Sequence, residues 1–424
     1  MIARILPAFI ILVVLMLLNF PIYISILVSG LYIMVFINQM PLQAIFTATF
    51  EGLAKNSLLA IPFFVLAGNI IAEGTLGRRL INCFATLLKN VRGGLPLACL
   101  VSNAFFGAIS GSPPAATAVF AKIIHKPLAE AESDKLATGL VVSAAGLASI
   151  IPPSVTMIIY GVVTETPVSN MFIAGICPGL VIVAIIGIYL ILRCKPGEKG
   201  KMDWKSVGRA WKSGIPVLLL PVLVLGGIYL GFVTPTEAGA LSAIYCAIAG
   251  LIMHEIKLKD FFSILKKSSF TIVQVFLLIA ASSFFARALT ISQFPQWVTS
   301  YFSSFSSVKF LLMLNILLLI VGCFFDTSAA ILILAPMLLP AALALGIDPI
   351  HLGIVFVVNL VIGMFTPPFG LNIFVAQSTL GYDIKYISKS LVPFIGLYIV
   401  ALLIITYVPS IALWLPHLMY GVVS

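Results

Sequence analysis

Four short polar segments interrupt long apolar stretches of the chain and hold most of its candidate ligand atoms. Two of them combine hydroxyls with a glycine or an acid, namely Ser110-Gly111-Ser112-Pro113-Pro114 and Asp326-Thr327-Ser328. The other two contain a double proline and run from Ser149 to Ser154 and from Phe365 to Asn372. Proline and glycine weaken a helix, so within a bilayer such breaks are stable only where they line a cavity or bind a ligand.

The chemistry of these breaks suits a hard cation such as sodium, because hydroxyls and freed backbone carbonyls supply oxygen ligands with little charge. We expect two sodium sites, each formed by one hydroxyl-rich tip and one proline break. The first comprises Ser110, Gly111, Ser112, Pro152 and Ser154, and the second comprises Asp326, Thr327, Ser328, Thr366, Pro367, Gly370 and Asn372. The helix that follows each tip directs the positive end of its dipole toward an anion.

Asp326 is nearly the only acid expected deep in the bilayer, where an ionisable side chain is costly and usually functional. A single proline break could be a structural kink, because proline and glycine are common in membrane helices. Four breaks that are paired by one sequence spacing favour a site instead. Arg287 is expected near the outer end of its span, where a side chain that reaches the interface explains it.

The amino-acid composition indicates a membrane protein. Apolar residues make up 61% of the 424 positions and charged residues 9%, whereas about a quarter of a soluble domain is charged. Uncharged runs of about 20 residues recur, and each is long enough to cross a membrane. The net charge of +10 does not indicate nucleic-acid binding, because the basic residues lie in short loops between the apolar runs. The six cysteines show no CxxC spacing and are expected to be apolar fillers.

One offset of 215 positions relates the two halves of the chain. It superposes Gly107 on Gly322 and Pro152-Pro153 on Pro367-Pro368. Most Lys and Arg fall in segments that a single topology places in the cytoplasm, with both termini outside. The basic loop at 78–92 corresponds to 293–307, which has no Lys or Arg. Equivalent loops are therefore expected on opposite faces, as in the inverted repeats of secondary transporters.

The sequence thus predicts an all-α membrane protein with two inverted repeats, about ten transmembrane helices and two re-entrant helical hairpins. The repeats are residues 1–193 with a hairpin at 93–122, and 214–424 with a hairpin at 309–345, joined by a cytoplasmic linker at 194–213. The expected spans are 4–19, 22–38, 57–75, 136–167, 171–193, 214–233, 237–253, 269–290, 352–382 and 391–413. Residues 40–56 and 254–268 are expected to form surface helices at opposite faces.

Several strings resemble the large membrane subunit of TRAP (tripartite ATP-independent periplasmic) transporters, and together they extend over essentially the whole chain. They are IPFFVLAGNI from Ile61, FFGAISGSPPAATA from Phe105, IIPPSVTMIIYG from Ile150, PTEAGAL from Pro235, FFDTSAAILILAPMLLP from Phe324 and FTPPFGLNIF from Phe365. Pro113-Pro114 departs from the small residues that the family pattern has after the first tip.

The resemblance implies an elevator-type ion transporter of the bacterial inner membrane that couples organic-acid import to a sodium gradient. Implied substrates are C4-dicarboxylates, sialic acid and other sugar acids. Implied partners are a small four-helix membrane subunit, expected as a separate chain, and a periplasmic substrate-binding protein. The residues expected to bind substrate are Ser112, Ala115, Thr117, Ser154, Thr156 and Asn372. No cofactor is expected besides Na+ as the coupling ion.

Other functions remain alternatives. A stand-alone sodium–dicarboxylate symporter would have a similar architecture, but its hairpin tips would carry Ser-Asn-Thr motifs, which this chain lacks. An intramembrane enzyme would need a nucleophile and base or paired acids at membrane depth. The four histidines, His125, His254, His351 and His417, are all expected in loops, so an enzyme is not expected. An ATP-driven pump is excluded for this chain alone because it has no GxxxxGK[ST] loop.

Overall fold

The computed structural model describes residues 2–41, 43–74, 76–197, 202–253 and 255–421. All regular secondary structure in these residues is helical. The first half contains α1 (Ile2–Leu17), α2 (Ile22–Tyr32) with a π-turn at Ile33–Ile37, α3 (Gln43–Leu53), a 3-10 turn at Asn56–Leu59, α4 (Ala60–Glu73), α5 (Leu76–Leu88), α6 (Gly94–Ser110), α7 (Pro113–Ala131), α8 (Asp134–Ala144), α9 (Leu147–Ile150), α10 (Val155–Thr164) and α11 (Val168–Arg193).

The second half repeats this order of helices. It contains α12 (Trp204–Tyr229), α13 (Pro235–Ile252), α14 (Leu258–Ile291), α15 (Phe294–Phe302), α16 (Ser307–Gly322), α17 (Thr327–Ala344), α18 (Pro349–Met364), α19 (Leu371–Leu380), α20 (Ile384–Tyr407) and α21 (Ser410–Tyr420). The offset of 215 positions carries the bounds of α6, α7, α10 and α11 to within a few residues of those of α16, α17, α19 and α20. The predicted pair of related halves therefore appears as two similar runs of helices.

Eight helical segments among the described residues are long and apolar enough to cross a membrane. Seven of them overlap predicted spans, namely those at 57–75, 136–167, 171–193, 214–233, 237–253, 269–290 and 391–413, and the eighth is the second hairpin arm at Thr327–Ala344. The predicted spans at 4–19, 22–38 and 352–382 instead consist of shorter apolar helices. In the last of these the proline break leaves α18 and α19 each too short to span alone.

The separate surface helix predicted at 254–268 is wrong where the structure describes it. Its residues from Leu258 onward form the first part of α14, a single helix of 34 residues that also contains the predicted span at 269–290. The chain has no proline or glycine between Leu258 and Ile291, so nothing in the local sequence ends the helix between them. His254 lies outside the described residues.

Two stretches predicted as connections are also helical. Helix α12 begins at Trp204, inside the predicted linker, where the side chain of Asp203 accepts hydrogen bonds from two backbone N–H groups of its first turn. The basic segment at 78–92 lies largely in α5, and its counterpart contains α15. Both helices are amphipathic and short, which hid them from a search for long apolar runs.

Each hairpin packs its first arm closely against a broken helix, at equivalent points in the two halves. A side chain at Gly107 of α6 would lie 2.5 Å from the Cα of Ala148, and one at Gly322 of α16 would lie 3.2 Å from the Cα of Gly363. Small residues at these positions let the helix backbones approach each other, as is common in membrane bundles. The hairpins are thereby held against the breaks that they were predicted to face.

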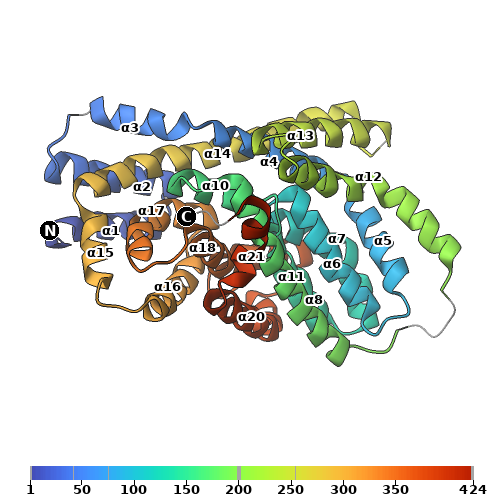
Figure 1. The fold of residues 1–424 in the computed structure, drawn as a ribbon. Helices are drawn as coiled ribbons and strands as arrows, with labels where there is room; N and C mark the ends of the chain where they lie inside the picture. Colours follow the sequence, from blue (N-terminus) through green and yellow to red (C-terminus); the bar gives the residue numbers. More distant parts are fainter. Residues whose placement is uncertain (1, 42, 75, 198–201, 254, 422–424) are drawn as a thin grey trace.

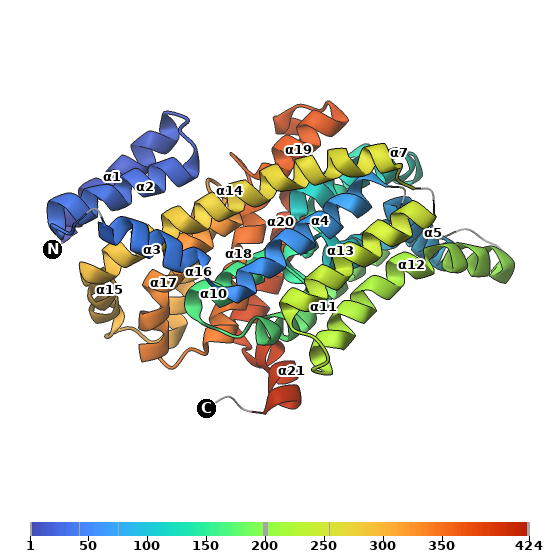
Figure 2. The same ribbon diagram turned by 90° about the horizontal axis from the view of Figure 1, so that it is seen from above.

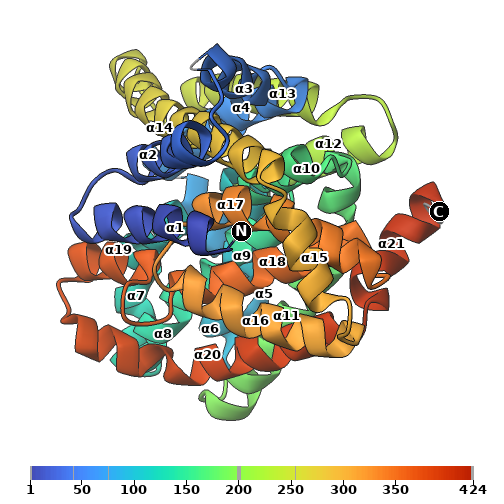
Figure 3. The ribbon, with the colours of Figure 1, turned by 90° about the vertical axis from the view of Figure 1, so that its left-hand side faces the viewer.

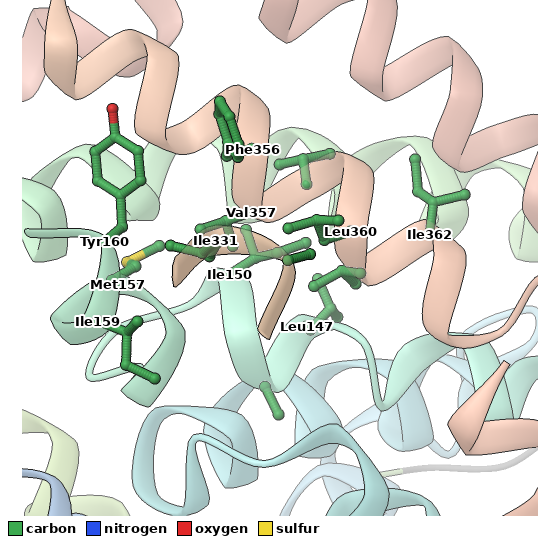
Figure 4. Packing of buried hydrophobic residues seen from close by; sticks show 14 of the residues in the cluster. Leu147, Ile150, Met157, Ile159, Tyr160, Ile331, Phe356, Val357, Leu360 and Ile362 are labelled. Carbon is green, nitrogen blue, oxygen red and sulfur yellow. The ribbon is translucent and has the colours of Figure 1, made fainter. Parts of the chain in front are cut away.

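The helices form two layers. Figure 1 shows α3, α4, α13 and α14 along the upper side, above the hairpins and the broken helices. Figure 2 shows α4 and α13 alongside α14, and the end-on view in Figure 3 places α16 and α20 on the opposite side, with α18 between. We call α1–α4 and α12–α14 the frame, and α6–α11 with α16–α20 the core unit. Figure 4 shows the centre of the core unit, where Leu147, Ile331 and Leu360 come from three different helices.

Candidate functional site

The first tip joins α6 to α7 through two residues, Gly111 and Ser112. Gly111 has φ = 56°, in the left-handed region that favours glycine, and its N–H donates to the carbonyl of Gly107. Pro113 then opens α7, at a position where a missing N–H costs little. The backbone therefore reverses sharply at a point where its hydroxyls remain near a helix end.

The first tip contacts the first proline break. A side chain at Gly111 would lie 3.3 Å from the backbone N of Val155 and 3.4 Å from the carbonyl oxygen of Pro153. Residues 151–154 are not helical, and the peptide bond between Pro152 and Pro153 is cis. Glycine at the tip is what allows the two irregular segments to meet at this distance.

Hydrogen bonds from serine and threonine hydroxyls connect the residues of this break. The fully buried Ser154 hydroxyl donates to the carbonyl of Ser149 at 2.7 Å and accepts from the N–H of Met157 at 3.4 Å, which caps α10. The Thr156 hydroxyl donates to that of Ser149 at 3.2 Å. The break thus presents a cluster of oxygen atoms in a buried setting, where each hydroxyl retains lone pairs for a ligand.

The second tip lies between α16 and α17. Asp326 caps α17, because its carboxylate accepts from the N–H of Ser328 at 2.9 Å. In the second break the Thr366 hydroxyl donates to the carbonyl of Ile362 at 2.6 Å, and the Pro367-Pro368 peptide bond is cis. The rings of Phe324 and Phe369 lie 5.6 Å apart, so this tip and this break are also neighbours.

The two breaks differ in exposure. Pro152, Pro153 and Ser154 are buried, whereas Pro367, Pro368 and Phe369 are exposed. The first tip packs closely against the frame: a side chain at Gly68 of α4 would lie 2.7 Å from the Cα of Ser110. The two halves therefore have similar elements in different surroundings.

Both tips line one cavity of about 910 Å³. Its wall includes eight of the predicted site residues: Ser110, Gly111, Ser112, Ala115, Thr156, Asp326, Thr327 and Ser328. The other predicted residues are not part of the cavity wall: Thr117, Pro152, Ser154, Thr366, Pro367, Gly370 and Asn372. Thr117 is fully buried and its hydroxyl donates to the carbonyl of Pro113, so it serves the helix. The structure thus gathers the tips around one space that could hold a small molecule.

The side chain of Asn372 is fully buried. Neither the oxygen nor the nitrogen of its amide has a hydrogen-bond partner within the described part of the chain. It lies in the first turn of α19, directly after the second break. A buried amide without partners is costly, so its position beside the break favours a ligand or ion there.

Sequence reasoning missed the polar residues that the frame contributes to the cavity. Asn69 of α4 and Thr271 and Gln274 of α14 line it, and the Asn69 amide donates to the hydroxyl of Ser268 at 2.9 Å. Arg78 and Lys122 line it as well. An isolated polar residue within an apolar run, such as Asn69, was the available signal.

The prediction that the histidines lie in loops is wrong for three of them. His125, His351 and His417 lie in α7, α18 and α21. His125 is buried, with its Nε2 2.9 Å from the hydroxyl of Thr138 and 3.6 Å from the carboxylate of Asp134. That carboxylate also accepts from Tyr382, and this hydrogen bond raises the pKa of the Tyr382 hydroxyl. None of these histidines lines the cavity.

The chain is similar to known membrane-transport proteins. A family model described as the DctM component of tripartite ATP-independent periplasmic transporters matches residues 9–411. The C4-dicarboxylate TRAP transporter large permease protein DctM of Pseudomonas aeruginosa is 39% identical over 378 residues, which are 87% of this chain and 88% of that protein.

Other relatives are named for different cargoes. The sialic acid TRAP transporter large permease protein SiaM of Vibrio cholerae is 30% identical over 95% of this chain and 96% of its own. The ectoine permease TeaC of Halomonas elongata is 31% identical over 96% and 97%. The solved YdaH transporter of Alcanivorax borkumensis shares the fold, with a TM-score of 0.57, 14% identity and 88% of each chain covered.

Proposed function

The chain belongs to the DctM family of TRAP transporters, and from this premise we propose that it is the large permease of a sodium-coupled importer of an organic acid. The observation that carries the proposal is the single cavity onto which both hydroxyl-rich tips open. Uptake driven by a sodium gradient into proteoliposomes that contain the complete transporter tests it. Uptake that does not respond to sodium would refute the coupling.

We place one sodium ion at each pair of tip and break. Ser110, Gly111 and Ser154 belong to the first pair, and Asp326, Thr366 and Asn372 belong to the second. The close approach of Gly111 to the carbonyl of Pro153 supports the first placement, and the unpaired amide of Asn372 supports the second. Oxygen atoms dominate both sets, as a hard cation requires.

The substrate is placed in the cavity, with its carboxylate near the start of α7 or α17. These helices begin at the tips and are 19 and 18 residues long. The positive ends of their dipoles attract an anion, and the hydroxyls of Ser112 and Thr156 can donate to it. Ala115 on the first turn of α7 shapes the wall.

Transport is proposed to proceed by movement of the core unit against the frame. The cavity also touches Arg78, Lys122 and Lys267, which belong to the basic segments assigned to the cytoplasm, so this conformation would open inward. The exposed apolar side chains of the frame, among them Leu6, Val222 and Ile244, suit lipid and a small four-helix subunit. A periplasmic binding protein would deliver the substrate on the outer side of the inner membrane.

Topology is the first prediction. Cysteines introduced singly at Ser206 of α12 and Ser303 after α15, in a background without the six native cysteines, should label from opposite sides. Ser303 should react with a membrane-impermeant thiol reagent in intact cells, and Ser206 should react only after the membrane is permeabilised. Reaction at Ser206 in intact cells would disprove the proposed orientation, with both termini in the periplasm.

A second prediction concerns Lys55, which links the frame to the core unit. Its ammonium donates to the carbonyl of Val162 near the C-terminal end of α10 at 2.7 Å and lies 3.8 Å from Glu165. Basic groups stabilise such helix ends. No comparable pair occupies the equivalent positions in the other half, which are Phe270 and Gln377. The contact should therefore favour the present conformation alone.

Replacement of Lys55 by Met should reduce the rate at which a single cysteine at Ala115 reacts from the cavity, by about threefold, a shift typical of a partly exposed ion pair. Lys55→Arg should retain the original rate because it keeps the charge and a donor. Equal rates in the Met and Arg variants would show that Lys55 does not stabilise this conformation.

A further inference from the structure

Three basic residues line the cavity, and they differ in whether an acidic side chain neutralises them. Lys267 of α14 lines the cavity, and its ammonium pairs with the carboxylate of Glu73 at 2.5 Å. Arg78 of α5 and Lys122 of α7 line the same cavity, and their side chains have no hydrogen bond or ion pair with any described residue. Both are exposed. Two positive charges therefore face the cavity without compensation.

Arg78 and Lys122 lie on turns of α5 and α7 that pack against each other. A side chain at Gly77 would lie 3.1 Å from Val119 and 3.6 Å from Ile123, so the turn of α5 that contains Arg78 lies against the turn of α7 that contains Lys122. The adjacent Arg79 differs, since its guanidinium pairs with Glu255 and hydrogen-bonds to Ser213. Only Arg78 of the two arginines is available to a ligand in the cavity.

The acids of the cavity wall do not balance this charge. Glu73 is paired with Lys267, and Asp326 lies at the second tip, where it caps α17. A cleft with an excess of positive charge concentrates anions, and a guanidinium binds a carboxylate through two parallel hydrogen bonds. We propose that Arg78 and Lys122 form an anion-binding vestibule that holds a carboxylate between the tips and the cytoplasmic water.

The passage of substrate through this vestibule rests on the proposed function, but the binding of an anion there does not. The general preference of membrane proteins for basic cytoplasmic loops would explain Arg78 and Lys122 without any site. Lys126 is the matched control for that explanation. It lies one turn further along α7, is exposed, and is not part of the cavity wall.

The test reads the electrostatic potential inside the cavity. A single cysteine replaces Ala118, which lines the cavity, in a background without the six native cysteines. Its reaction rates with a negatively charged and a positively charged methanethiosulfonate are compared in purified protein. Arg78→Gln and Lys122→Gln should each lower the ratio of the two rates about fivefold, because a charge on the cavity wall acts on the two reagents with opposite sign. Lys126→Gln should leave the ratio nearly unchanged.

Succinate provides the binding probe. It should slow the reaction of the cysteine at position 118 in the parent protein, and the Arg78→Gln/Lys122→Gln double variant should need at least about tenfold more succinate for the same protection. The proposal would be wrong if Lys122→Gln and Lys126→Gln lowered the ratio of the two reaction rates equally. It would also be wrong if succinate did not slow the reaction in the parent protein. The assay needs no sodium gradient and no partner protein, so its failure is distinct from a failure of transport.

Discussion

Replacement of Asp326 by Ala should abolish sodium-driven uptake or raise the sodium concentration for half-maximal uptake at least about tenfold, which corresponds to about 1.4 kcal/mol. Asp326 lies on the wall of the cavity at the second tip. Its carboxylate is the one acidic group among the proposed sodium ligands, so its removal takes away the charge that offsets the dehydration of the ion. Uptake measured over a range of sodium concentrations gives the result directly.

The same carboxylate caps α17, and two further variants separate this role from ion binding. Asp326→Asn keeps a capping side chain but removes the charge, so it should retain the stability of the helix and still weaken sodium dependence. Asp348 caps α18 through N–H groups of Ile350 and His351 and does not line the cavity. Asp348→Ala should lower stability by about 1 kcal/mol with unchanged sodium dependence. An Asp326→Asn variant with the parent's sodium dependence would remove Asp326 from the site.

Much of the candidate site could be predicted, because residues next to one another in the sequence determine where its helices break. Glycine at 111, the double prolines and the capping Asp326 each fix a short piece of backbone, wherever the rest of the chain packs. The spacing of 215 positions then paired them. The structure places the first tip against the first break and the second tip beside the second, as that pairing implied.

The frame was less predictable for a physical reason. Whether residues 258–291 form one helix or two depends on where they meet water, lipid and α4, and the apolar pattern alone does not fix this. Likewise, Asn69 and Arg78 line the cavity because of how their helices pack, and the local sequence does not determine that packing. Their types suggested only an isolated polar residue and an interfacial charge.

The difference in solvent exposure between the two proline breaks could not be predicted from the sequence either. Thr366-Pro367-Pro368-Phe369 and Ile151-Pro152-Pro153-Ser154 occupy equivalent positions, yet the prolines are exposed in one and buried in the other. Their immediate surroundings on the frame differ, since Ser110 meets Gly68, whereas the position equivalent to Gly68 is Ser283. In the proposed elevator motion, the core unit would exchange these surroundings between the two halves.

The largest effect should come from removal of the partners. This chain alone, reconstituted with a sodium gradient, should accumulate no substrate, because its described residues form no separate domain that could bind solute in the periplasm. Addition of a small membrane subunit and a loaded binding protein should restore uptake. The small subunit is expected to hold the frame in the lipid while the core unit moves, through exposed apolar faces of α1, α2, α12 and α13.

Uptake into proteoliposomes, with each component omitted in turn, is therefore the most direct test of the proposed function. Candidate binding proteins are loaded with radiolabelled succinate, N-acetylneuraminate or ectoine, and accumulation is followed with and without an inward sodium gradient. We predict saturable uptake only when this chain, the small subunit, a matching binding protein and sodium are all present. Saturable, sodium-driven uptake by this chain alone would contradict that prediction and identify a stand-alone symporter.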